Sequence, residues 1–155
     1  MRGELPMKIR RHKPSDLPTL YKIDQACFSP GISYSKSEIA RFISHRGSRT
    51  WVAEDGEETV GFLIAGRASK DVGHIVTIDV LAGWRRRGVG RELMDAVEAW
   101  AVEQGLRMLY LETAVDNLAA QRFYRRRNYA KIDEVERYYS DGKAAWVMAK
   151  MVGNA

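Results

Sequence analysis

The chain is poor in cysteine and has no long hydrophobic run. Its 155 residues include one cysteine, Cys27, which excludes an internal disulfide framework and is typical of a reducing cytoplasm. We interpret Cys27 as a buried thiol rather than a nucleophile, because it lies in a helix-like stretch. No apolar run approaches the roughly 20 residues that cross a bilayer, so we expect no membrane partner. Repeats, linkers and low-complexity tracts are also missing, which favours one domain over residues 1–155, with residues 1–6 as a loose N-terminal extension.

Two common phosphate-binding motifs are missing as well. No Gly-Lys-Ser/Thr sequence follows the glycine turn, which excludes a Walker loop. A Rossmann fingerprint has three glycines after the first strand, whereas the glycine turn of this chain has two and comes late. That turn, Arg85–Gly90, follows the apolar run 74–81 and opens a helix-patterned segment that reaches about Gln104. Since backbone N–H groups at a helix start bind anions, the turn predicts a site for a diphosphate-bearing cofactor.

Changes of hydrophobic period divide the chain into strands and helices. The expected strands are 8–11, 51–53, 59–64, 74–81, 108–113, 129–135 and 144–151. The expected helices run from 15–16 to about 28, over 35–45, from 88 to about 104, and over 117–126. Short turns join the early strands and helices join the later ones. This order predicts an α/β fold in which a mixed central sheet of six to seven strands is flanked by four helices.

Two segments carry a resemblance to a known family. Val80–Met94, with the sequence VLAGWRRRGVGRELM, resembles the signature segment of the GNAT superfamily of acetyl-CoA-dependent N-acetyltransferases. The second segment, Leu111–Tyr129, also matches, with Glu112 on a strand and with Asn117 and Tyr124 on the following helix. Its motifs are most similar to those of the bacterial ribosomal-protein alanine N-acetyltransferases, which act on protein N-termini. The resemblance implies a single GNAT domain, acetyl-CoA as co-substrate, no metal, and direct attack by a primary amine.

The resemblance also implies where the cofactor lies. The backbone amides of residues 86–91 would hold the pyrophosphate, and the backbone of residues 78–80 would run beside the pantetheine. Asn117 matches a cofactor contact and is also a favourable helix N-cap. Asp79 is interpreted as turned away from the acetyl group or as a substrate contact, not as catalytic. The implied cofactor-binding residues are Ile78, Asp79, Val80, Arg85, Arg86, Arg87, Gly88, Val89, Gly90, Arg91, Asn117 and Tyr124.

Amine attack on a thioester requires removal of a proton from the ammonium and protonation of the leaving thiolate. By resemblance, Tyr124 is the general acid. Glu112 matches the family's catalytic glutamate, and partial burial on its strand would raise its pKa toward the working range. His74 is the rival, because other superfamily members place a Glu or His at that point and imidazole titrates near neutrality. The base stays open between Glu112, His74 and a water chain.

The acceptor is the least constrained prediction. Tyr138 and Tyr139 resemble the tyrosine pair that grips a peptide in protein N-terminal acetyltransferases, and Tyr34 lies in a loop that we expect to border the site. The turn 140–144 is shorter than in that subfamily, so a small-molecule amine (polyamine, aminoglycoside or amino acid) is the alternative acceptor. The exposed strand edges permit a monomer or a homodimer.

Two functions other than acetyl transfer are remote alternatives. The net charge is +5, and arginines cluster at 85–87 and 122–127, so a nucleic-acid-binding module is one alternative. No recognised nucleic-acid motif supports it, and the second cluster also reads as the solvated face of a helix. A non-catalytic acyl-CoA sensor is the other alternative, which the joint presence of Tyr124, Glu112 and His74 disfavours.

Overall fold

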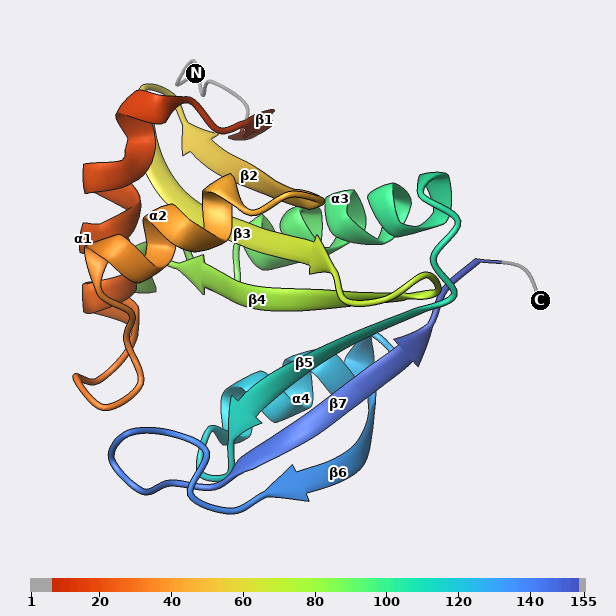
Figure 1. Ribbon diagram of the computed structural model, residues 1–155. Helices are drawn as coiled ribbons and strands as arrows, with labels where there is room; N and C mark the ends of the chain where they lie inside the picture. The colour runs from red at the N-terminus through yellow and green to blue at the C-terminus, as the bar shows by residue number, and fades with distance from the viewer. Residues whose placement is uncertain (1–6, 154–155) are drawn as a thin grey trace.

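The changes of period along the chain correspond to seven strands and four α-helices within residues 7–153, the part of the chain that the computed structural model describes (Figure 1). The strands are β1 Met7–Arg11, β2 Ser48–Asp55, β3 Glu58–Arg67, β4 Val72–Val80, β5 Met108–Ala114, β6 Ala130–Val135 and β7 Ala145–Met151. The helices are α1 Leu17–Cys27, α2 Lys36–Ser44, α3 Val89–Glu103 and α4 Leu118–Arg126, with short 3₁₀ turns η1 Pro14–Asp16 and η2 Ala82–Trp84. The predicted α/β class and the predicted order of elements are confirmed. Residues 1–6, the expected extension, lie outside the described residues.

The strands form one mixed sheet in the order β1-β2-β3-β4-β5-β7-β6. Neighbouring strands are antiparallel except β4 and β5, which are parallel and pair only from Val72–His74 to Met108–Tyr110. Beyond these three rungs the two strands diverge, as Figure 1 shows. The edge of β4 that faces β5 is therefore left without a strand partner over residues 75–80. Apart from the Val80 carbonyl, which accepts from Arg85 and Cys27, its backbone groups are available to a ligand.

A β-bulge in β4 decides which of its side chains face α1 and α2. Ile64 of β3 pairs with Thr77 and the next residue, Ala65, pairs with Ile75, so Val76 has no partner on β3. An extra residue of this kind interrupts the strict alternation of a strand. As a result, Val76 packs with α1 and α2, while Thr77 and Asp79 face that same side of the sheet.

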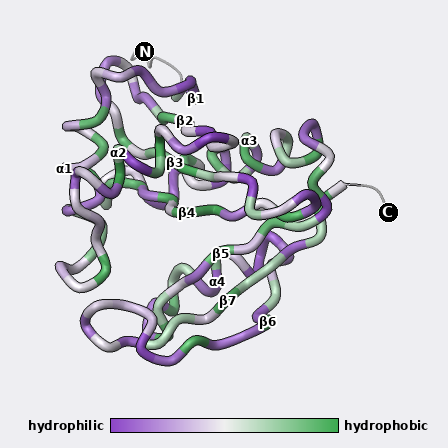
Figure 2. The backbone as a smooth tube through the Cα atoms, viewed as in Figure 1, coloured by the Kyte–Doolittle hydropathy of each residue, from purple (hydrophilic) through white to green (hydrophobic). Residues whose placement is uncertain are grey.

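Helices cover both faces of the sheet and enclose two hydrophobic clusters. Leu20, Ile23 and Ile39 of α1 and α2 pack on Val52 and Phe62. On the other face, α3 contributes a stripe at helical spacing against β2 to β5, as expected for an amphipathic helix. Figure 2 shows this alternation of hydrophobic and hydrophilic residues along α3. Within residues 7–153, no helix is both long enough and apolar enough to cross a membrane.

Some strands are longer than the sequence patterns predicted. β2 covers Ser48–Asp55 rather than residues 51–53, because its polar first residues pair with the end of β3. β4 begins at Val72, two positions before the predicted start, because its first three residues form the only parallel rungs with β5. Ladder pairing, which hydropathy does not report, accounts for both differences.

Candidate active site

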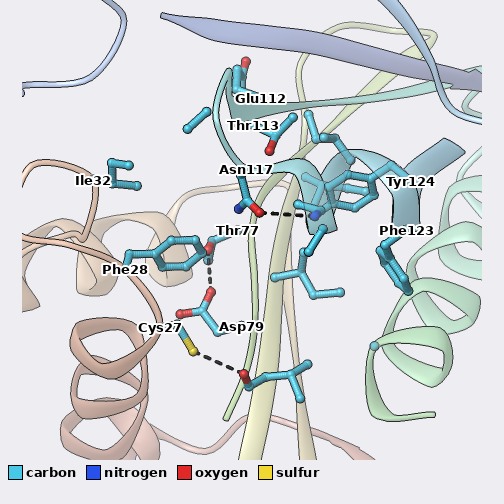
Figure 3. A pocket seen from close by; sticks show the side chains of 18 of the residues that line it. Cys27, Phe28, Ile32, Thr77, Asp79, Glu112, Thr113, Asn117, Phe123 and Tyr124 are labelled. Carbon is cyan, nitrogen blue, oxygen red and sulfur yellow. Dashed lines mark hydrogen bonds between the residues drawn. The ribbon is translucent and has the colours of Figure 1, made fainter. Parts of the chain in front are cut away.

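A pocket of about 1070 Å³ opens where β4 and β5 diverge (Figure 3). Its wall is built from the α1–α2 loop, β4, the start of α3, β5, α4 and the β6–β7 loop. One end is bordered by the Arg85–Gly90 turn, and the other by Tyr34, Tyr138 and Tyr139. Elongated pockets of this size hold drug-sized or larger ligands.

The turn before α3 has the backbone geometry of an anion site. Gly88, the N-cap residue, has φ +87°, and Arg86 has φ +63°, so the chain turns sharply into the helix. The first N–H groups of α3 have no intrahelical acceptor, and they carry the positive end of the helix dipole. A Cβ at Gly90 would lie 3.3 Å from the Phe123 ring, so the absence of a side chain there lets α3 approach α4.

The structure divides the arginines of this turn by their roles. The Arg85 Nε donates to the carbonyl of Val80 at 2.9 Å, so this side chain is tied to β4. Arg86 lines the pocket together with Gly90, whereas the exposed Arg87 and Arg91 do not. The side chain of Val89 is buried in the core, and Gly88 does not line the pocket either. Contacts from residues 87–89 to a ligand would therefore involve backbone amides.

Arg122 and Arg126 of α4 also line the pocket. They belong to the arginine cluster 122–127 noted in the sequence, but they were not among the predicted cofactor-binding residues. Their spacing of four residues, on the same helix as Tyr124, was the signal that could have identified them. The neighbouring Arg127 instead forms ion pairs with Asp95 and Glu98, at 2.7 Å and 3.3 Å. Positive charge at this end of the pocket suits a phosphorylated ligand.

Asn117, the N-cap residue of α4, and Tyr124 of the same helix project into the pocket (Figure 3). The Asn117 Oδ1 accepts from the N–H of Ala120 at 3.2 Å, which caps the helix and leaves the rest of the carboxamide toward the pocket. Tyr124 is 7% exposed and packs edge-on against Phe123 and Tyr129. Burial raises the pKa of the Tyr124 phenol. The hydroxyl therefore keeps its proton and is suited to act as a donor.

The two rival bases form one hydrogen-bonded pair. The Nε2 of His74 on β4 lies 2.6 Å from the Oε1 of Glu112 on β5, beside the last parallel rung. The His74 ring stacks on Tyr110 at 4.4 Å, which fixes its orientation. Glu112 lines the main pocket, whereas His74 lies behind it and borders a smaller hollow beside α2. The carboxylate is thus the member of the pair that can touch a substrate.

Three tyrosines form the wall of the pocket opposite the Arg85–Gly90 turn. Tyr34 packs edge-on against Phe42 at 4.9 Å, and Tyr138 and Tyr139 pack on each other at 4.9 Å. Burial raises the pKa of Tyr138 to about 12, so its hydroxyl is neutral near pH 7. The loops that carry these tyrosines are in contact, because the Ser140 hydroxyl donates to the Gly31 carbonyl at 2.8 Å.

Asp24 is a further buried group of the site that the sequence analysis missed. It is 0% exposed on α1, adjacent to Asp79 of β4, which is 1% exposed. An acid next to Ile23, on the apolar stripe of a helix, was the signal that could have identified it. Cys27, at the end of the same helix, is half-buried, and burial raises the pKa of its thiol to about 11. It is therefore not a nucleophile near neutral pH.

The fold and the pocket together define a class of acyl-transfer enzymes. The chain belongs to the acetyltransferase (GNAT) family, whose model matches residues 17–129. The predicted superfamily is thus confirmed, and the protein is an acetyl-CoA-dependent N-acetyltransferase.

Two curated relatives match most of the chain. An N-acetyltransferase of Methanocaldococcus jannaschii is 31% identical over 150 residues, which cover 96% of this chain and 94% of the relative. The catalytic subunit of the N-terminal acetyltransferase A complex of Arabidopsis thaliana is 36% identical over 149 residues, covering 92% of this chain and 76% of the relative.

Two solved structures share the whole fold. Ard1 from Thermoplasma volcanium superposes with a TM-score of 0.88 at 29% identity, covering 96% of this chain and 99% of that one. The ribosomal-protein alanine N-acetyltransferase of Escherichia coli, the group that the motifs most resemble, has a TM-score of 0.86 at 22% identity. In that comparison 97% of this chain and 96% of the other are covered.

Proposed function

We propose that the protein transfers the acetyl group of acetyl-CoA to the α-amino group at the N-terminus of a protein or peptide. The observation that carries this proposal is the tyrosine wall of Tyr34, Tyr138 and Tyr139, which faces the His74–Glu112 pair across the acceptor end of the pocket. Hydroxyls on two facing loops suit the backbone amides of an extended peptide. The Arabidopsis relative, an N-terminal acetyltransferase subunit, supports the same acceptor class.

Acetyl-CoA fits the end of the pocket that the Arg85–Gly90 turn borders. The free amides at the start of α3, with Arg86, Arg122 and Arg126 around them, would hold its phosphates. The unpaired edge of β4 over residues 78–80 would pair with the amides of the pantetheine, as an added strand does. Asn117 would fix the cofactor near the reacting carbonyl. In this assignment Arg85 acts through β4, and residues 87–89 and 91, which do not line the pocket, would contribute backbone amides alone.

Glu112 acts as the base in this proposal, and His74 supports it. The carboxylate faces the pocket and accepts the proton of the attacking amine, while the imidazole behind it orients the carboxylate and shares the proton. As the bond from the amine nitrogen to the acetyl carbon forms, the carbon–sulfur bond breaks. Tyr124 then donates its proton to the leaving sulfur. For an acceptor that enters as the neutral amine, one proton enters the protein at Glu112 and one leaves it at Tyr124. Proton exchange with solvent then returns Glu112 to the carboxylate and Tyr124 to the phenol before the next turnover.

The acceptor is tested by measuring release of the CoA thiol with a panel of amines. We expect turnover with peptides that have a free N-terminus and none with the same peptides blocked at the N-terminus but carrying an internal lysine. Mass spectrometry of the product locates the acetyl group. Turnover with polyamines or aminoglycosides alone would overturn the peptide assignment in favour of a small-molecule acceptor.

We also propose a cytoplasmic location, on the ground that the one thiol, Cys27, is half-buried and fits a reducing compartment. Fractionation of the source cells, with an antibody against the protein, tests it. Recovery in a membrane or secreted fraction would count against the proposal.

A further inference from the structure

Two carboxyl groups meet inside the protein, between α1 and β4, directly behind the pocket wall. The side chains of Asp24 and Asp79 lie within hydrogen-bonding reach of each other, and both residues are almost completely buried. Figure 3 shows Asp79 beside Thr77 and Cys27, on the side of the pocket that α1 covers. Two ionised carboxylates in contact would repel each other strongly there, because little solvent screens them.

Each carboxyl has one satisfied oxygen and one orphaned oxygen. The Thr77 hydroxyl donates to the Oδ1 of Asp79 at 2.5 Å, and the backbone N–H of Tyr34 donates to the Oδ2 of Asp24 at 2.7 Å. The Oδ1 of Asp24 and the Oδ2 of Asp79 are buried and have no donor among the described residues. A buried acceptor without a donor is unfavourable. One proton shared between the two neighbouring carboxyl groups supplies the donor that they lack.

The other polar groups around the pair do not supply this donor. Arg85 approaches from the turn after η2, where its Nε donates to the carbonyl of Val80, and it donates to neither of the two orphaned oxygens. Cys27 of α1 donates its thiol to the same carbonyl, at 3.4 Å. The Tyr124 phenol, on α4, belongs to the pocket.

The balance of charge around Asp79 favours its protonated form. Burial is the largest cause that raises its pKa well above the usual value, and the neighbouring Asp24 raises it further. The hydrogen bond from Thr77 and the charge of Arg85 act in the opposite direction and are weaker. The pair therefore holds one proton in the range where exposed aspartates have none.

We propose that Asp24 and Asp79 share one proton and that this bridge positions the acceptor wall of the pocket. The bridge joins β4, which borders the cofactor path, to α1. From α1 it reaches Tyr34, whose N–H is held by Asp24 and whose carbonyl accepts from the Gln25 side chain at 2.9 Å. Removal of the shared proton places two negative charges in contact and moves α1, with Tyr34, away from β4. The positioning role rests on the proposed function, whereas the shared proton does not.

The bridge has a consequence for stability with a defined sign. The pKa of Asp79 is raised in the folded protein and is ordinary in the unfolded chain. Between these two values the folded state holds more protons than the unfolded state, so the free energy of unfolding falls as pH rises through that window. Below the ordinary value the full contribution is present, and above the raised value it is lost. Asp79→Asn removes this pH dependence.

Infrared difference spectra test the shared proton without any acceptor. At pH 7 the wild type minus Asp79→Asn spectrum should show the carbonyl stretch of a protonated carboxyl, with a shift in deuterium oxide. The wild type minus Asp24→Asn spectrum should show it as well. The matched control is Asp71→Asn, because Asp71 is exposed. Its difference spectrum should contain carboxylate bands and the amide bands of the new asparagine, with no band of a protonated carboxyl. A spectrum of Asp79→Asn without the band of a protonated carboxyl would overturn the shared proton, whatever the acceptor.

Acceptor kinetics test the positioning role. An asparagine at position 79 can donate its amide N–H to Asp24 in place of the shared proton, whereas an alanine leaves Asp24 as an unpaired buried charge. We expect the acceptor KM of Asp79→Ala to exceed that of Asp79→Asn by about tenfold, with a smaller change in kcat. The ratio of the wild-type KM to that of Asp79→Asn should rise with pH as the shared proton is lost, because titration of the acceptor amine affects both proteins equally. The same alkaline rise in both proteins, or equal KM values in the two variants, would refute the positioning role.

Discussion

Tyr124 presents a hydroxyl to the pocket from an otherwise buried ring, and burial keeps that hydroxyl protonated. We expect Tyr124→Phe to lower kcat by about 100-fold and to leave both KM values close to wild type, because the phenyl ring fills the same space but cannot protonate the leaving sulfur. Release of the CoA thiol measures this. Tyr21→Phe is the control, since Tyr21 lies on α1 and does not line the pocket. A kcat for Tyr124→Phe equal to that of the wild type at every pH would show that another group is the acid.

For the His74–Glu112 pair, we predict a larger loss of kcat when Glu112 is substituted than when His74 is. Glu112→Gln should lower kcat by about 100-fold, because an amide in contact with the substrate cannot accept the proton. His74→Gln should lower it by about tenfold, because glutamine still donates a hydrogen bond to Glu112 but cannot share the proton. Single-turnover rates with saturating acceptor, over a range of pH, give both values. A larger loss for His74→Gln than for Glu112→Gln would make His74 the base.

At the scale of elements, Asn117 joins a helix cap to the cofactor site, and substitutions can separate the two roles. Asn117→Ala should lower the free energy of unfolding by about 1 kcal/mol, because it removes the bond to the N–H of Ala120. Asn117→Ser retains the cap and should retain the stability, while the KM for acetyl-CoA rises. Chemical denaturation and substrate titrations measure the two effects. An unchanged acetyl-CoA KM in Asn117→Ser would leave the residue as a cap alone.

The sequence could predict the elements but not which face some of their side chains occupy. Hydrophobic periods located all seven strands and four helices, and the glycine turn located the start of α3. Strict alternation along β4, however, would place His74 and Val76 on one face and Thr77 and Asp79 on the other. The bulge at Val76 brings all four to the side of α1 and α2. Nothing in the local sequence marks a bulge that forms through pairing with β3.

Contacts between residues far apart in the sequence could not be predicted either. The pattern offered His74 and Glu112 as rivals, because their separation of 38 positions gives no register for the parallel strands. Asp24 was missed because an acid on a helix is usually exposed, and only the approach of β4 shows that it is buried. Resemblance supplied the roles of single residues, whereas their pairing depended on the tertiary fold.

At the scale of the whole molecule, the pocket is a wedge between two parts of one sheet. Strands β1 to β4 form one part and β5 to β7 the other, and the parts are joined by only three parallel rungs at one end. At the far end the α1–α2 loop and the β6–β7 loop lie side by side in Figure 1, where Ser140 bonds to Gly31. The wedge is thus closed by strand pairing at one end and by loop contact at the other. The tyrosine wall depends on the contact between the two loops, whereas the Arg85–Gly90 turn does not depend on it.

That asymmetry predicts separate effects on the two substrates. Ser140→Ala removes the bond to the Gly31 carbonyl, and Gly31→Ala places a Cβ in collision with Asp141, so both variants should part the loops. We expect the acceptor KM to rise about threefold in Ser140→Ala, the size of a modest exposed hydrogen bond, and further in Gly31→Ala. The KM for acetyl-CoA should stay constant, because the bond between Ser140 and Gly31 does not involve the turn before α3.

Initial rates with each substrate varied in turn give the two KM values. Ser69→Ala, an exposed serine between β3 and β4, is the matched control and should change neither. If the KM for acetyl-CoA rose in parallel with that for the acceptor, the loop contact would stabilise the whole wedge rather than the acceptor end. If neither moved in Gly31→Ala, the loops would have no part in binding the acceptor, and the tyrosine wall would have to be held by α1 and β4 alone.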